Sequence, residues 1–101
     1  MDMSRSTYAR EKLGLAVITL ATHAERIPER VAQAIRQLVA VTEDDLPNDL
    51  KADFRSLRET VGRGGEHRID DETATKAANT LLEIESRLNG YLDDFYRTKA
   101  G

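Results

Sequence analysis

The sequence predicts an all-α protein, specifically a four-helix, mostly antiparallel bundle with a long C-terminal helix. Apolar residues recur at helical spacing along most of the 101 residues, and no segment shows the alternating pattern of a half-buried strand. The longest helical pattern places apolar residues three and four positions apart at Ala74, Ala77, Leu81, Ile84, Leu88, Tyr91 and Phe95. This seam indicates a helix that packs lengthwise on its neighbours and forms the spine of the bundle.

The length and composition fit one helical domain over residues 1–101. Apolar residues make up 40% of the chain and charged residues 33%, which is within the range of globular proteins. The absence of cysteine excludes disulfides and thiolate zinc sites, and it favours a cytoplasmic location. The net charge of -3 is mild and does not by itself indicate nucleic-acid binding.

The first helix is expected over residues 7–22, with hydroxyls from the cluster 4–7 capping its start. Its apolar run, residues 13–21, has nine residues, whereas a transmembrane helix needs about 20, so no membrane span is predicted. Gly14 lies inside this run and costs about 1 kcal/mol relative to alanine. It marks either a close approach of another backbone or a tolerated glycine.

The apolar residues of the first helix occupy two faces. Leu13, Val17 and Leu20 form one row, which is expected to face the core. Leu15 and Ile18 lie nearly opposite that row. They need cover from another layer of the bundle or from a partner.

Prolines define the starts of the next two helices, expected over residues 28–41 and 47–61. Pro28 and Pro47 suit a first helical turn, where a missing N–H costs nothing. The second helix has one apolar stripe, at Val31, Ile35, Leu38 and Val39. The third has another, at Leu50, Phe54, Leu57 and Val61.

A glycine-rich loop and an N-cap precede the last helix. Residues 62–69 are expected to form a flexible loop, because glycine carries the highest entropic cost in a helix. Asp70 is a good N-cap for a helix over residues 71–97. The pair Asn89-Gly90 would normally end a helix, but the heptad pattern continues through it. We therefore expect one long helix that is weakest at this pair.

The sequence predicts no catalytic residues, no cofactor and no metal site. His23 and His67 are the only imidazoles, and both fall in predicted connections. The loop glycines lack the strand and the Gly-Lys-Ser/Thr ending of a phosphate-binding loop. A small helical enzyme is therefore a distant third hypothesis, in which His67 would be the functional imidazole.

Basic side chains on the second and third helices support an alternative function, that of a nucleic-acid-binding regulator. Such side chains can reach phosphates and base edges. The candidates are Arg26, Arg30, Lys51, Arg55 and Arg58. Acidic residues are interleaved with them, as on the solvated face of many amphipathic helices.

Protein–protein interaction is the preferred hypothesis, because apolar side chains extend beyond the faces that the bundle needs. The candidate interface residues are Leu15, Ile18, Leu82, Leu88, Leu92, Phe95 and Tyr96. We expect a non-enzymatic interaction or regulatory module whose partner is a second copy, forming a homodimer, or another protein. No membrane partner is expected.

Several short segments carry a family resemblance. They are Glu11-Lys12-Leu13, Glu29-Arg30-Val31, and Glu43-Asp44-Asp45-Leu46-Pro47 with Phe54 and Leu57. Over residues 8–61 the chain resembles a loose group of small bacterial helical proteins of uncharacterised function. The resemblance implies a bacterial cytoplasmic protein and transfers no active site.

Overall fold

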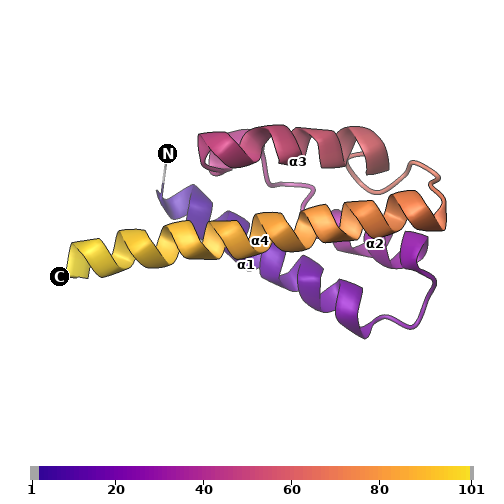
Figure 1. Cartoon of the computed structure of the whole chain (residues 1–101), viewed down its shortest axis with the longest axis horizontal. Helices are drawn as coiled ribbons and strands as arrows, with labels where there is room; N and C mark the ends of the chain where they lie inside the picture. Colours follow the sequence, from indigo (N-terminus) through magenta and orange to yellow (C-terminus); the bar gives the residue numbers. More distant parts are fainter. Residues whose placement is uncertain (1–2, 101) are drawn as a thin grey trace.

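The computed structural model describes residues 3–100, and within them it contains helices and no strand. Four α-helices and one short 3-10 helix follow one another along the chain: α1 (Met3–Thr22), α2 (Ile27–Arg36), η1 (Glu43–Asp45), α3 (Asn48–Val61) and α4 (Asp71–Ala100). Successive α-helices run in alternate directions (Figure 1). The predicted all-α, mostly antiparallel bundle is confirmed.

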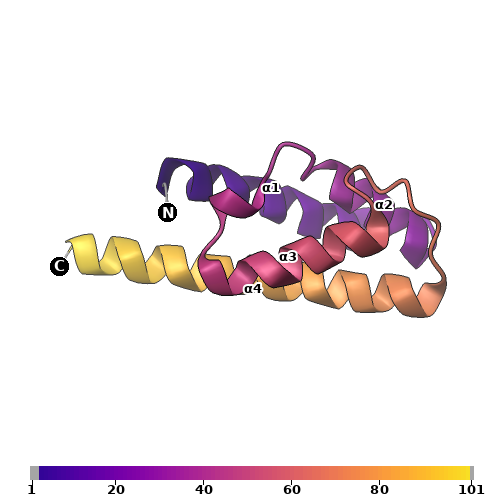
Figure 2. The ribbon, with the colours of Figure 1, turned by 90° about the horizontal axis from the view of Figure 1, so that it is seen from above.

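The long helix α4 is the spine of the bundle, as its seam predicts. It packs against α1, α2 and α3, and its C-terminal end extends past the first turns of α1 (Figures 1 and 2). It is continuous through Asn89 and Gly90 and reaches Ala100, beyond the predicted end at residue 97. The backbone N–H of Thr73 donates to Asp70 Oδ1 at 2.8 Å, so Asp70 is the N-cap that the sequence predicts.

The core is one continuous cluster to which all four α-helices contribute. Along α4 the buried line begins as predicted, at Ala74, Ala77, Leu81, Ile84 and Leu88. Its end differs, because Leu92 is fully buried while Tyr91 and Phe95 are 41% and 37% exposed. In a straight helix, positions seven residues apart rotate by about 20° per heptad relative to an ideal 3.5-residue repeat. By the end of α4 this rotation has moved positions 91 and 95 away from the core and brought position 92 toward it.

The start of α1 differs from the prediction. In the described residues the helix extends back to Met3, so residues 4–7 lie inside it rather than ahead of it. Ser6 is buried, and its Oγ donates to the backbone oxygen of Asp45 at 2.7 Å. A hydroxyl that the sequence assigns to capping instead attaches α1 to η1.

The end of α2 also differs, because the helix stops at Arg36 and residues 37–40 form a turn. Three arginines from distant segments donate to three successive carbonyl oxygens of this turn: Arg58 to Leu38, Arg63 to Val39 and Arg5 to Ala40. Carbonyls at a helix C-terminus lack helical donors and carry partial negative charge. The arginines add donors to these oxygens, although the Leu38 oxygen also accepts the N–H of Val41 at 2.9 Å. The helix ends earlier than its apolar stripe suggests.

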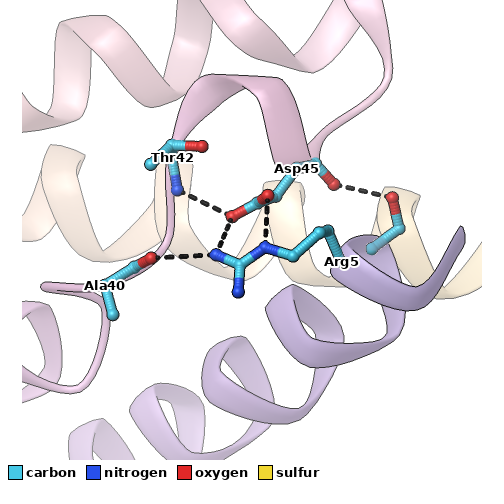
Figure 3. A network of polar contacts seen from close by, with 5 residues as sticks. Arg5, Ala40, Thr42 and Asp45 are labelled. Carbon is cyan, nitrogen blue, oxygen red and sulfur yellow. Dashed lines mark hydrogen bonds and ion pairs between the residues drawn. The ribbon is translucent and has the colours of Figure 1, made fainter. Parts of the chain in front are cut away.

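A polar network connects α1 to η1 (Figure 3). Arg5 donates from Nε and Nη2 to the two carboxylate oxygens of Asp45, each at 3.0 Å. The backbone N–H of Thr42 donates to Asp45 Oδ2 at 2.9 Å. Burial opposes ionisation of Asp45, but the hydrogen bonds from Arg5 and Thr42 outweigh it and lower its pKa. Asp45 is therefore a buried carboxylate held in its charged form.

The loop before α4 packs directly on α2. Gly62 ends α3 with a φ of 89°, and Gly65 has a φ of 76°. A Cβ on Gly65 would lie 2.7 Å from the backbone oxygen of Ala32. Both the backbone angle and the close contact require glycine at position 65.

Candidate interaction surface

Three aromatic side chains gather on the C-terminal half of α4 and remain exposed. Tyr91, Phe95 and Tyr96 are 41%, 37% and 44% exposed. The C-terminal end of α4 extends past the body of the bundle (Figure 2). The sequence predicts Phe95 and Tyr96 at a partner surface, and it also predicts Tyr91 and Phe95 in the core seam. The structure places all three at the surface.

The two adjacent rings are held by each other and by α1. The rings of Phe95 and Tyr96 meet edge to face, with centroids 5.3 Å apart and an interplanar angle of 81°. The Tyr96 hydroxyl lies 3.2 Å from Thr7 Oγ1. One turn earlier on α4, Asp93 lies 3.8 Å from Arg10 of α1. This end of α4 is thus positioned by α1.

Tyr91 is held from the other side, by α3. Its hydroxyl donates to Asp49 Oδ2, which also accepts from Arg87 Nη2 at 2.7 Å. The hydrogen bond from Tyr91 is the main cause that lowers the pKa of Asp49, and the same bond raises the pKa of Tyr91. The Tyr91 ring therefore remains exposed while its hydroxyl is fixed.

A hollow of about 220 Å³ lies on the outer side of α4 and is lined by Arg87, Gly90, Tyr91 and Asp94. Gly90 leaves this space open, because a Cβ there would meet nothing within 4 Å. Gly14 in α1 is equally open, so no close backbone approach within residues 3–100 explains it. The hollow is a feature that sequence reasoning missed.

The remaining predicted interface residues divide into exposed and buried groups. Leu15, Ile18 and Leu82 are 41%, 57% and 42% exposed, the first two on α1 and the third on α4. Leu88 and Leu92 are fully buried in the chain's own core, so their assignment to a partner surface is wrong. Both side chains follow the inward line of α4 and contribute to folding.

The five candidate nucleic-acid contacts are all engaged within the chain. Three pair with acidic side chains, Arg26 with Asp71 at 2.9 Å, Lys51 with Asp44 at 3.7 Å and Arg55 with Glu43 at 2.6 Å. Two donate to backbone oxygens, Arg30 to Leu20 at 3.3 Å and Arg58 to Leu38. The structure uses these side chains to connect its helices and to cap α2.

A second and larger hollow, of about 620 Å³, lies where α2 and α4 begin. Its lining includes His67 and five acidic residues, Glu29, Glu66, Asp70, Asp71 and Glu72. His67 Nδ1 is 3.3 Å from the backbone oxygen of Thr60. Across residues 3–100, no group of three or more histidines and acids is arranged to hold a metal ion.

No family model, curated protein or solved structure matched the chain. Among the helices of residues 3–100, none combines the length and the apolar character that crossing a bilayer requires.

Proposed function

We propose that this protein is a non-enzymatic interaction module that binds another protein chain through the exposed C-terminal half of α4. The observation that supports this is the cluster of Tyr91, Phe95 and Tyr96 on one exposed helix segment. The chain has only five aromatic residues, and three of them lie here. Aromatic side chains are enriched at protein interfaces, where they supply much of the binding energy.

The support of these rings by neighbouring helices favours binding further. Asp49 fixes the Tyr91 hydroxyl, and Thr7 contacts the Tyr96 hydroxyl, so neither side chain must be ordered when a partner arrives. Preorganised side chains lose less conformational entropy on binding. From the resemblance to small bacterial helical proteins, we place this interaction in the bacterial cytoplasm.

Nucleic-acid binding is not proposed, because the five basic side chains that would serve it are bonded within the chain. Phosphate contacts would have to compete with these pairs. An enzyme is not proposed either, because the ring of His67 has its hydrogen bond with the backbone oxygen of Thr60, which is not a group that an imidazole can activate as a nucleophile.

Site-specific photo-cross-linking in the native host tests the proposal. A benzophenone amino acid at Phe95 is expected to give a discrete adduct with a protein chain, identified by mass spectrometry. The matched control is Val39, which is 51% exposed but lies in the turn after α2. No adduct from position 95, or the same adducts from both positions, would contradict the proposed surface.

A further inference from the structure

Resting on the proposed function, we propose that the C-terminal half of α4 binds a second copy of the chain, through the outward face that adjoins Tyr91. In this dimer the two α4 helices cross antiparallel at Gly90, with Glu83 of each copy opposite the partner's Arg97. Three features of the outer side of α4 support this arrangement: the open space beside Gly90, the order of charges along the helix, and the exposure of Glu83 and Arg97.

A single outward stripe runs along α4 on both sides of Gly90. Its members are spaced four and three residues apart: Glu83, Arg87, Gly90, Asp94 and Arg97. Residues at this spacing share one face of a helix. Gly90, at the centre, lies opposite the inward line that contains the fully buried Leu88 and Leu92. The stripe therefore faces away from the protein's own core.

The charges along this stripe are arranged so that an antiparallel copy of the same stripe places opposite charges next to each other. Read from Glu83 to Arg97, the signs are negative, positive, neutral at Gly90, negative and positive. An antiparallel copy centred on Gly90 places Glu83 opposite the partner's Arg97, since both lie seven residues from the centre. The two-fold symmetry of a homodimer makes this pair twice. A parallel pair would instead place like charges together.

The centre of the stripe is shaped for a close crossing. Glycine is a poor helix former, and the open space beside Gly90 shows that packing within the chain does not require it. The hollow lined by Gly90 and Tyr91 can admit the backbone of a second helix, because small contact residues shorten the distance between helix axes. Leu82 and Tyr91 flank the stripe and are 42% and 41% exposed, so they offer apolar contact beside it.

The two side chains that would set the antiparallel orientation, Glu83 and Arg97, are not held by strong contacts within residues 3–100. Glu83 is exposed and has no hydrogen bond or ion pair with any residue in the described part of the chain. Arg97 makes only a loose contact with Asp94, at 3.8 Å between side chains that are 79% and 78% exposed. Arg87, by contrast, is already paired with Asp49 at 2.7 Å. Glu83 and Arg97 are therefore the pair that selects the antiparallel register.

Charge reversal tests this register by analytical ultracentrifugation of the full chain. Glu83→Arg and Arg97→Glu should each raise the dimer dissociation constant about tenfold, because each places like charges at two symmetric contacts. The double variant E83R/R97E should regain the wild-type constant. An equimolar mixture of the two single variants should form a heterodimer, since each of its two contacts then joins an arginine of one variant to a glutamate of the other. A double variant or mixture as weak as the single variants would overturn the register.

Leucine substitutions test the crossing point. Gly90→Leu should abolish dimerisation by filling the hollow, while Gly14→Leu, in an equally open helical position, should leave it intact. Circular dichroism confirms that both variants are folded. A wild-type chain that is monomeric at tens of micromolar, yet still gives a Phe95 adduct with a different protein, overturns the self-pairing alone. A monomer that gives no adduct overturns both proposals.

Discussion

Arg5 and Asp45 lie 40 positions apart in the sequence and form a two-point contact, with both nitrogen–oxygen distances at 3.0 Å. The same guanidinium donates to the backbone oxygen of Ala40 at 3.2 Å. Paired bonds between arginine and a carboxylate fix orientation as well as distance. This contact anchors η1 on α1, and η1 leads directly into α3, which carries Asp49 to Tyr91. The exposed tyrosine is thus positioned in part by a contact between α1 and η1.

Asp45→Asn should destabilise the protein at neutral pH by about 1–3 kcal/mol, because the buried site loses a charged acceptor for Arg5. The folded-state pKa of Asp45 is lowered, so its contribution is present above the pKa of the unfolded chain. It is lost as the pH falls through the lower, folded-state pKa. Urea denaturation at pH 7 and at several values below about pH 4 measures both effects.

Asp44 provides the matched control for this substitution. Its side chain is 95% exposed and lies 3.7 Å from Lys51. Asp44→Asn should change stability little at any pH. Equal losses from the two variants, or a loss in D45N that does not shrink in acid, would refute the assigned role of Asp45.

Glycine-to-alanine substitutions should have opposite effects at two positions. Gly65→Ala should destabilise the protein by about 1–3 kcal/mol, because the positive φ and the Ala32 backbone both oppose a Cβ. Gly14→Ala should stabilise it by up to about 1 kcal/mol, since the Cβ meets open space within a helix. Thermal and urea denaturation compare the two, and a destabilising effect of G14A would show that Gly14 has a packing role.

Alanine substitutions at two leucines of α4, one buried and one exposed, should differ in their effect on the free energy of unfolding. Leu92→Ala should cost about 2–5 kcal/mol, because the side chain is fully buried. Leu82→Ala, at a position that is 42% exposed, should change the free energy of unfolding by less than about 0.5 kcal/mol. Denaturant unfolding in the E83R background, at concentrations where that variant is monomeric, excludes any contribution from association. Similar losses at both sites would show that Leu82 also belongs to the core.

Local signals in the sequence were enough to predict several parts of the fold. Pro28 lies in the first turn of α2, and Asp70 caps α4, because both effects depend only on neighbouring residues. The end of α2 was not predictable in this way. Its turn carbonyls bind Arg5, Arg58 and Arg63, which reach them only after the chain has folded.

The candidate surface was only partly predictable for a related reason. An apolar pattern identifies the faces of a helix but does not determine which residue points inward near its end. The sequence therefore predicts Tyr91 in the core and Leu92 at the surface, whereas Leu92 is buried and Tyr91 is exposed. The sequence predicts that the helix is weakest at Gly90, but it does not identify Gly90 as the centre of an outward stripe. The alternating charges of Glu83, Arg87, Asp94 and Arg97 were visible in the sequence, but only the structure shows that this face is outward.

Arg58 and Arg55 both lie on α3 but should differ strongly in their contribution to stability. Arg58 donates to the Leu38 oxygen and lies 4.4 Å above the Phe54 ring, and burial is the main cause that lowers its pKa. Arg58→Met should cost about 1–3 kcal/mol, because the Leu38 oxygen keeps only the N–H of Val41 as a donor and the cation–π contact with Phe54 is lost, while the aliphatic packing is retained. Arg55→Met removes the same charge from an exposed pair with Glu43 and should have little effect. Urea denaturation at neutral pH compares the two variants. Equal losses would mean that net charge, rather than capping of α2, explains why Arg58 matters.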